Sequence, residues 1–328
     1  MAAVQAAPVP FDAEASVDKA CRLIQEAAAK GADIVAFGEA WLPGYPYFAW
    51  LPQVTPEWYS AAADYLASSV DIPGPITDKL CQAARRASVE LIMGVVERSK
   101  SQGTTYCTLL FISKDGEIIG KHRKLKPTLA ERTVWGEGDA SGLRVHDRPI
   151  ARISGLSCWE NKMMLPGYAL MAQGTQVHVS AWPGIPEDSP MEVPAHPRQK
   201  LLSQAFALQG GCYVISPSIV LRAEDVPEKH AALLMGDQVG GSYIIDPCGK
   251  VIAEAGAGET ILIAKGNLDL VRAAKMASDV GGSYSRPDLL QLMINNRPLE
   301  QLIEFSAEGA GRGNLVSNSP EVSEQEGE

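Results

Sequence analysis

Three polar residues each stand directly after a short apolar run. Cys158 follows "ISGLS", Glu39 follows "DIVAFG" and Lys124 follows "EIIGKHR". A thiol, a carboxylate and an amine are suited to nucleophilic hydrolysis, because a base can activate the thiol while a cation stabilises developing negative charge. Residues just after the strands of an α/β fold are where catalytic groups collect. The pattern therefore predicts a hydrolytic site at strand ends.

Cys158 lies where a predicted strand, about Ile150 to Leu156, turns into a helix-like stretch. A thiol at such a turn meets backbone N–H groups that lower its pKa and hold negative charge. The competing interpretation is a buried structural cysteine, since free cysteine is among the most buried residue types. We keep that interpretation for the cysteines inside apolar helical or strand patterns: Cys21, Cys81, Cys107, Cys212 and Cys248.

Glu39 follows a predicted strand from Ile34 to Phe37 and precedes an aromatic segment. Bulky apolar neighbours raise the pKa of a glutamate towards neutrality, which suits a general base. The alternative is a solvated acid on a loop. Prolines and a glycine between Pro43 and Pro52 indicate a loop, and its aromatic residues are then expected to line a pocket rather than a core.

Lys124 belongs to a strand-end segment with four basic residues. Strand periodicity places His122 and Lys124 on one face and the neighbouring basic residues on the other, so one lysine can enter a pocket while others stay in solvent. A solvated basic edge strand is the alternative. Glu131 and Trp135 follow, offering a second carboxylate and another pocket-lining aromatic.

Four helix-then-strand units position these residues, at 20–39, 80–97, 167–182 and 201–218. They predict an α/β protein with helices on sheet faces, and two units in each half indicate a duplicated architecture. Hairpin turns are predicted at Lys114–Gly116 and near Pro247–Gly249, which favours a mixed sheet. We expect one domain over 1–305 and a disordered acidic tail over 306–328.

Composition excludes several classes. The 328-residue chain has a net charge of −10, so a general nucleic-acid-binding surface is not expected. No apolar run reaches the roughly 18 residues that cross a bilayer, and the N-terminus lacks a secretory pattern. The spacing of six cysteines and five histidines fits neither a zinc site nor a disulfide framework, and no phosphate-binding loop is present. These features predict a cytoplasmic protein with free thiols.

Several segments together resemble the nitrilase branch of the carbon–nitrogen hydrolase superfamily, whose hallmark is a Glu-Lys-Cys triad. The segments are "FGEAWLPGYP", "HRKLKPTLAERTVWGEGD", "GLSCWEN", "VHVSAWPG" and "DVGGSYSRPDLL". The resemblance extends from about residue 2 to 291, and Cys-Trp-Glu at 158–160 is similar to true nitrilases. One departure is Ser283, where the family often has histidine; it bears on substrate range or assembly.

The resemblance implies roles residue by residue. Glu39 matches the general base, Lys124 the triad lysine with Lys126 as a rival, Cys158 the nucleophile, and Glu131 a supporting glutamate. It implies hydrolysis of a small-molecule nitrile to an acid and ammonia, with no metal or organic cofactor. The expected pocket is lined by Trp41, Tyr47, Trp135, Trp159 and Trp182. This aromatic surface favours aryl or arylalkyl nitriles, while a pocket narrowed by tryptophans suits aliphatic ones.

The resemblance also implies an α-β-β-α sandwich that forms homodimers or larger spirals, with 285–305 either as an assembly segment or as a segment packed on its own subunit. An amidase, a carbamoyl hydrolase or a cyanide-hydrolysing enzyme would use the same triad. Two further alternatives are a catalytically silent scaffold and a thiol redox sensor. The intact Glu39, Lys124 and Cys158 argue against a silent protein, and a redox sensor requires a resolving cysteine near Cys158.

Overall fold

The computed structural model describes residues 1–185, 195–234 and 236–299, with side chains in the second range from 198 onward. Met1–Arg297 form one compact unit, and Pro298–Glu328 form a second of which only the first two residues are described. The predicted tail at 306–328 and part of the predicted assembly segment, 300–305, lie outside the described residues.

The first six-stranded sheet is mixed. Its spatial order is β14-β1-β2-β3-β4-β5, with parallel pairs among β1, β2 and β3 and antiparallel pairs elsewhere. The strands are β1 (Ala2–Gln5), β2 (Ile34–Phe37), β3 (Glu90–Arg98), β4 (Thr105–Ile112), β5 (Ile118–Arg123) and β14 (Thr260–Ile263).

The second six-stranded sheet repeats this plan. From β6 to β13 its neighbours pair antiparallel, parallel, parallel, antiparallel and antiparallel, the same sequence of pairings found from β14 to β5. The strands are β6 (His146–Asp147), β7 (Arg152–Ser157), β8 (Val177–Ala181), β9 (Tyr213–Ser216), β12 (Tyr243–Ile245) and β13 (Val251–Glu254). The predicted duplication is therefore confirmed at the level of sheet topology.

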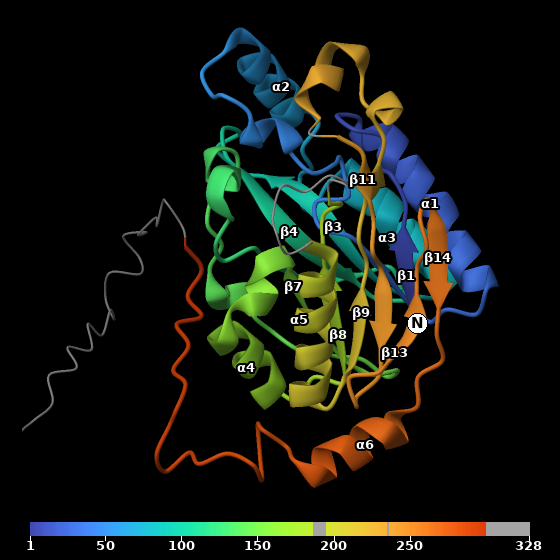
Figure 1. Cartoon of the computed structure of the whole chain (residues 1–328), viewed down its shortest axis with the longest axis vertical. Coiled ribbons are helices and arrows are strands. Elements are labelled where there is room, and N and C mark those ends of the chain that lie inside the picture. The colour runs from blue at the N-terminus through green and yellow to red at the C-terminus, as the bar shows by residue number, and fades with distance from the viewer. Residues whose placement is uncertain (186–194, 235, 300–328) are drawn as a thin grey trace, which may run out of the picture. The chain divides into compact units, whose positions relative to one another are not determined.

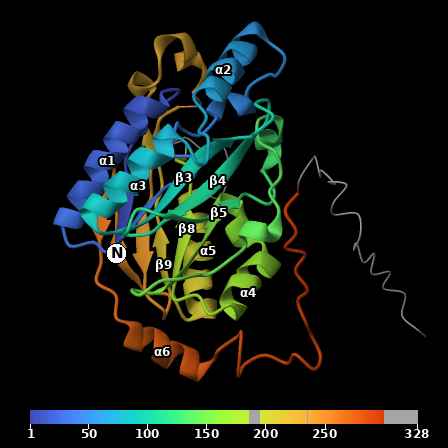
Figure 2. The ribbon, with the colours of Figure 1, turned by 180° about the vertical axis from the view of Figure 1, so that it is seen from behind.

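Helices cover the outer faces of both sheets. Figure 1 shows α4 and α5 in front of the second sheet, and Figure 2 shows α1 and α3 over the first. The helices are α1 (Ala13–Ala29), α2 (Pro56–Ala67), α3 (Pro75–Ala87), α4 (Met164–Ala172), α5 (Ala195–Gly210) and α6 (Leu268–Ala277). Short elements complete the fold: β10 (Val220–Leu221), β11 (Gln238–Val239), η1 (Tyr47–Trp50), η2 (Leu129–Thr133), η3 (Ala140–Gly142), η4 (Cys158–Lys162), η5 (Ala223–Asp225) and η6 (Glu228–Leu233).

Strand periodicity explains the layers. Along β2, Val35 and Phe37 pack under α1 and α3, whereas Ile34 and Ala36 pack in the core between the sheets. A third core lies between the second sheet and α4–α5. Because alternate residues point to opposite faces, a strand buried on both sides is apolar throughout. The layering is the predicted α-β-β-α sandwich. Within the described residues, no helix is both long and apolar enough to span a bilayer.

The predicted units and turns are present, with two differences. Each of the four units is a helix followed by a strand, and both hairpins form, with β4 pairing β5 and β12 pairing β13. Strand β7 begins at Arg152 rather than Ile150. Cys248 is exposed in the β12–β13 turn, where Asp246 Oδ1 accepts its backbone N–H, so the expectation of a buried structural cysteine there was wrong. All six cysteines are free.

Candidate active site

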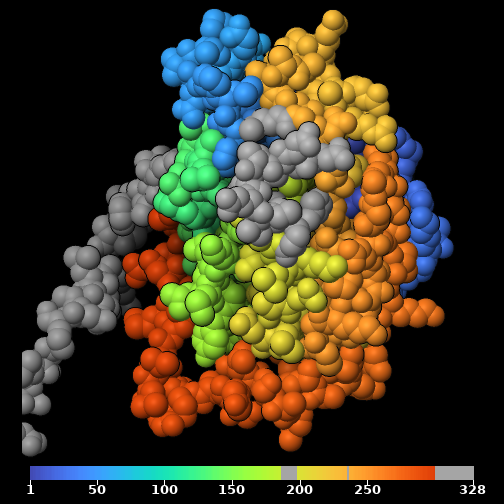
Figure 3. All heavy atoms as spheres, in the orientation of Figure 1, coloured from blue at the N-terminus to red at the C-terminus, as the bar shows by residue number. Residues whose placement is uncertain are grey.

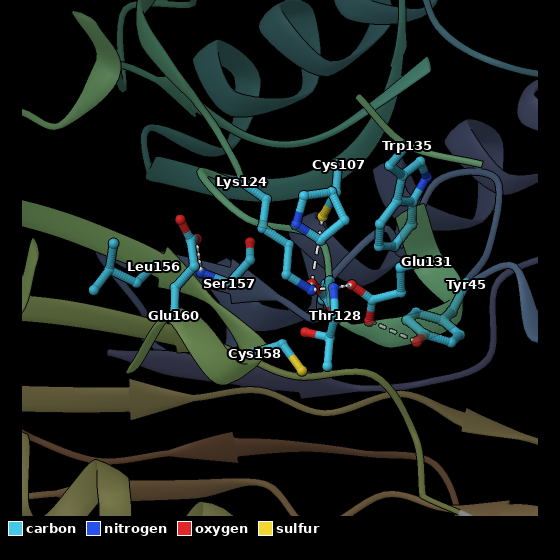
Figure 4. Close-up of polar contacts among 12 residues, drawn as sticks. Tyr45, Cys107, Lys124, Thr128, Glu131, Trp135, Leu156, Ser157, Cys158 and Glu160 are labelled. Carbon is cyan, nitrogen blue, oxygen red and sulfur yellow. Dashed lines mark hydrogen bonds and ion pairs between the residues drawn. The ribbon is translucent and has the colours of Figure 1, made fainter. Parts of the chain in front are cut away.

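Three segments distant in sequence converge in one buried cluster. Glu39 follows β2 and Lys124 follows β5 on the first sheet, whereas Cys158 follows β7 on the second. The Nζ of Lys124 lies 2.7 Å from Glu39 Oε1 and 2.6 Å from Glu131 Oε2. The Cys158 sulfur and one carboxylate oxygen from each glutamate all lie within 4.8 Å of one another. Figure 4 shows Lys124, Glu131 and Cys158 in this cluster.

Backbone contacts with both sheets hold Glu39. Its N–H donates to Trp182 O, at the end of β8, over 3.1 Å. The following Leu42 N–H donates to Gly94 O of β3. A Cβ added at Gly94 would lie 2.7 Å from Ala40 N and would overlap Gly38 O, so β3 passes too close for a side chain there. The carboxylate therefore stands on a backbone fixed from two sides.

The Glu39 carboxylate has an altered proton affinity. Burial raises its pKa, and the Lys124 ammonium opposes that effect, leaving a pKa of about 7. Among the described residues, its Oε2 has no hydrogen-bond partner although it is buried. A carboxylate with one free oxygen and a pKa near neutrality can accept a proton at physiological pH.

Lys124 is fully buried and bound by two carboxylates. Burial lowers the pKa of its amine, but the negative charges around it outweigh that effect, and its pKa lies well above the ordinary value. The amine is therefore a persistent cation. Within the part of the chain that the structure describes, one group has the spacing to bind a metal ion: Glu39, Glu131 and Cys158. The Lys124 ammonium already binds both carboxylates and would repel a second cation.

Cys158 begins the η4 turn in a strained conformation. Its φ is +54°, a left-handed value that costs a non-glycine residue about 1–3 kcal/mol. Burial, with the nearby Glu39 charge, raises the pKa of its thiol well above the ordinary value, although Lys124 and the Trp159 N–H act in the opposite direction. The resting thiol therefore keeps its proton at neutral pH and needs a base to remove it.

Glu131 connects the cluster to the aromatic loop. Its Oε2 accepts the Thr128 N–H at 2.6 Å in addition to binding Lys124, and its Oε1 accepts the Tyr45 hydroxyl at 2.7 Å. Trp50 Nε1 in turn donates to Tyr45 Oη. The bonds from Thr128 and Tyr45 hold Glu131 in position, and Glu131 in turn holds the Lys124 amine.

The predicted alternation along β5 is confirmed. His122 and Lys124 are buried on one side, whereas Lys121 and Arg123 both bind Glu97. Lys126, the rival lysine, pairs with Glu137 where both side chains are about half exposed. In the described interactions, Lys124 contacts the cluster and Lys126 does not.

The five predicted pocket aromatics do not form a single group. Burial raises the pKa of the Tyr47 hydroxyl, and the nearby charges of Glu39 and Cys158 raise it further. Tyr47 therefore lies close to both residues. The Trp135 ring lies 5.4 Å from Lys124 Nζ. The rings of Trp159 and Trp182 meet edge to face, with their centroids 6.0 Å apart. The fifth residue, Trp41, packs instead in the core beneath α1 and α3, and its indole N–H donates to Ala6 O.

Two residues beside the cluster were missed from sequence. Cys107 on β4 donates from Sγ to Glu39 Oε1 over 3.4 Å, and Tyr45 binds Glu131. The turn at 114–116 alone would place Cys107 opposite Arg123. A register shift between Phe111 and Ile112 places it opposite Lys124 instead, whose N–H donates to Cys107 O, so this contact could not be predicted from the turn. Tyr45 lies on the loop whose aromatic residues were expected to line a pocket, but its bond to Glu131 was not predicted, because a loop has no register.

Comparisons with known proteins agree with this geometry. The sequence profile of the family described as carbon–nitrogen hydrolase matches residues 1–276. The chain is 48% identical to "Nitrilase 2" from an unknown prokaryotic organism, over 94% of this chain and 96% of that protein. It is 39% identical to an "Aliphatic nitrilase" of Rhodococcus rhodochrous, over 90% and 82%. A solved carbon–nitrogen hydrolase from Helicobacter pylori G27 superimposes with a TM-score of 0.68 at 18% identity, covering 84% and 92%.

Proposed function

Because the chain belongs to the carbon–nitrogen hydrolase family and to its nitrilase branch, we propose that it hydrolyses organic nitriles to carboxylic acids and ammonia. The observation that carries the proposal is the cluster of Glu39, Lys124 and Cys158, buried together in a chain 48% identical to a protein named as a nitrilase.

The first half of the reaction forms a covalent thioimidate. The Cys158 sulfur bonds to the nitrile carbon, and the thiol proton passes through Glu39 to the nitrile nitrogen. The free Oε2 of Glu39 and its pKa of about 7 support its role as the base. Because the pKa of the thiol is raised, the thiol needs this base to remove its proton.

The second half consumes two water molecules. Glu39 removes a proton from the first water, which adds to the thioimidate carbon, and passes that proton to the nitrogen. The hydroxyl proton of the adduct then also moves to the nitrogen, so that ammonia leaves and a thioester remains. The second water hydrolyses the thioester in the same way and returns the Cys158 thiol. The balance is one nitrile and two waters to one acid and one ammonia, so no oxidant or reductant takes part.

Lys124 and the Trp159 N–H stabilise the negative charge that develops on nitrogen or oxygen. The persistent positive charge of Lys124 and the position of the Trp159 N–H at the Cys158 sulfur support these roles. Such groups are most effective when they are already oriented before the reaction. Glu131 keeps Lys124 oriented, since it binds the amine at 2.6 Å and is itself held by Thr128 and Tyr45.

The substrate side chain is the finer part of the proposal. Tyr47, Trp159 and Trp182 support a preference for aryl or arylalkyl nitriles, through apolar burial and ring contacts. The position of Trp41 in the core reduces the aromatic surface available. The name of the Rhodococcus relative favours aliphatic nitriles instead. Comparing kcat/KM for benzonitrile, phenylacetonitrile and butyronitrile decides between them.

The test of the function is ammonia release from nitriles. Wild type, Cys158→Ala and the control Cys81→Ala, which removes a thiol on α3, are assayed with nitriles, the matching amides and cyanide. We expect acid and ammonia from nitriles with wild type and the control, and no turnover with Cys158→Ala. Intact mass during turnover is expected to show an adduct on Cys158. Retained hydrolysis in Cys158→Ala would overturn the mechanism.

Other outcomes of this assay identify the competing functions. Turnover of amides alone indicates an amidase or carbamoyl hydrolase, and formate or formamide from cyanide indicates a cyanide-hydrolysing enzyme. No turnover with an unmodified Cys158 indicates a silent scaffold. The six free cysteines support the reducing cytoplasm as the compartment.

We also propose that the protein works as a homodimer or larger homo-oligomer. The outer surfaces of α4 and α5 support this, because Figure 3 shows these elements at the surface and four of their apolar side chains are more than 60% exposed. They are Met164, Leu165, Leu201 and Leu208. Light scattering after size exclusion should give a mass of at least twice 35.1 kDa, and Leu201→Glu should reduce it.

A further inference from the structure

The carboxylate of Glu160 joins the two segments that carry the candidate catalytic groups. Its Oε2 accepts the Ser157 N–H at 2.9 Å, and its Oε1 accepts the Leu125 N–H at 2.7 Å. Ser157 directly precedes Cys158, and Leu125 directly follows Lys124. Figure 4 shows Glu160 beside Ser157, on the other side of the turn from Cys158.

A third donor completes the carboxylate's environment. Nε2 of His122, on β5, lies 3.1 and 3.3 Å from the two oxygens of Glu160, and both side chains are buried. Burial raises the pKa of Glu160, but His122 and the two backbone donors outweigh it, and the pKa lies below the ordinary value. Glu160 is therefore a buried anion whose acceptor oxygens are satisfied by three separate groups.

The turn at Cys158 needs support because its backbone is strained. Cys158 has a φ of +54°, which surrounding interactions must maintain. Asn161 holds the carbonyl side, since its Nδ2 donates to Cys158 O at 2.9 Å and its Oδ1 lies 3.1 Å from His178 Nε2. Glu160 accepts the N–H of Ser157, on the N-terminal side of Cys158. It also accepts the N–H of Leu125, in the segment of the other sheet that carries Lys124, which Asn161 does not reach in its described contacts.

We propose that Glu160 is a positioning residue that sets the distance between the Cys158 thiol and the Lys124 amine across the two sheets. The inference rests on the proposed function, in which these two groups act together. Glu160 does not touch the reacting atoms; it acts by clamping the backbone on either side of them. Displacing a catalytic group by about 1 Å can reduce a rate by a factor of about 100.

Glu160→Gln is the sharpest variant. The amide keeps the volume of the carboxylate but replaces one acceptor oxygen with an NH2 group, so either Ser157 N–H or Leu125 N–H faces another donor. Glu97→Gln is the matched control. Glu97 is an equally buried carboxylate bound by Thr108, Lys121 and Arg123 rather than by the Cys158 turn.

The kinetic experiment compares both variants with wild type on the best nitrile, with active sites counted by covalent titration of Cys158. We expect kcat of Glu160→Gln to fall roughly 30- to 100-fold with KM changed less than about threefold, and Glu97→Gln to keep kcat within about threefold. Thermal unfolding measures the stability loss of each variant separately. Equal kcat losses in the two variants, or a Glu160→Gln kcat within threefold of wild type, would overturn the inference.

A second measurement does not depend on nitrile turnover. Iodoacetamide alkylation of Cys158, located by peptide mass, is followed against pH, because the midpoint reports thiolate formation whatever the accessibility of the thiol. If Glu160 keeps Lys124 near the thiol, Glu160→Gln raises this midpoint by about half a pH unit or more, and Glu97→Gln does not. An unchanged midpoint contradicts the clamp, even when the wild type hydrolyses no nitrile.

The inference remains testable if Glu160→Gln does not fold. Glu160→Asp keeps the charge but is one methylene too short to reach both backbone donors, and the same thresholds apply to it. His122→Ala removes one donor and leaves the two backbone bonds, so its kcat is expected to fall less than that of either Glu160 variant. A larger loss in His122→Ala would move the positioning role from Glu160 to His122 and overturn the assignment.

Discussion

The thiol of Cys107 donates to Glu39. Its Sγ lies 3.4 Å from Oε1, the same carboxylate oxygen that binds Lys124 Nζ at 2.7 Å. One oxygen of the candidate base is thus occupied by two donors, while the other is left for the reaction. A donor to the ionised form lowers the pKa of a carboxyl group, so Cys107 opposes the larger effect of burial on Glu39.

The pH dependence of the wild type should report the ionisation of Glu39. With a pKa of about 7, Glu39 is protonated below neutrality and cannot accept the Cys158 proton. We expect kcat/KM to rise about tenfold per pH unit below that value and to level off above it. A pH–rate profile measures this, and an acid limb near pH 4.5 would contradict the assignment of Glu39 as the base.

Replacing Cys107 should move that acid limb. Cys107→Ala removes the S–H donor, so the pKa of Glu39 rises and the limb shifts to higher pH. Cys107→Ser keeps a donor at the same position and should leave the limb at or below its wild-type midpoint. Equal midpoints for the alanine and serine variants would show that the thiol does not tune the base.

The two rival lysines can be separated by matched variants. Lys124→Gln removes a buried cation from two carboxylates and should reduce kcat by at least roughly 100-fold. Lys126→Gln breaks a half-exposed pair with Glu137 and should change kcat by less than about twofold. Steady-state kinetics with ammonia detection measures both, and a large loss at Lys126 instead would reverse the assignment.

Removing the Tyr45 hydroxyl should weaken catalysis through Glu131. Tyr45→Phe leaves Oε1 of a buried carboxylate without the donor it has at 2.7 Å, and hydrogen bonds to charged groups contribute about 1.5–3 kcal/mol. If this free energy is lost from the stabilisation of the transition state, kcat falls about tenfold or more. The control is Tyr59→Phe on α2, an exposed tyrosine. Indistinguishable kcat values would show that Tyr45 does not support the cluster.

A side chain at Gly94 should damage both the fold and the site. The Cβ of Gly94→Ala would collide with the backbone that leads into and out of Glu39, and backbone cannot rotate away as a side chain can. We expect a lower melting temperature and a kcat loss larger than the unfolded fraction explains. Gly103→Ala, whose Cβ meets nothing within 4 Å, is the control and should melt close to wild type.

Much of the fold was contained in local sequence patterns. Short apolar runs predicted the strands around Phe37 and Leu156, the Lys114–Gly116 turn predicted the β4–β5 hairpin, and the period of two placed His122 and Lys124 on the same face. These predictions succeeded because periodicity and turn chemistry depend on near neighbours in the chain. The candidate Glu, Lys and Cys were also recognisable, because each follows a strand within a family motif.

Sequence by itself thus determined the helix–strand units, the two hairpin turns and the identity of the candidate groups. Tertiary structure alone decided how they meet: Glu39 and Lys124 leave one sheet and Cys158 leaves the other, so their separation depends on how the sheets pack. The bond from Leu125 to Glu160 spans 35 residues and has no local signature. Trp41 shows the same limit, since its motif cannot tell a core from a pocket. The physical reason is that packing between layers sums many long-range contacts that no short segment encodes.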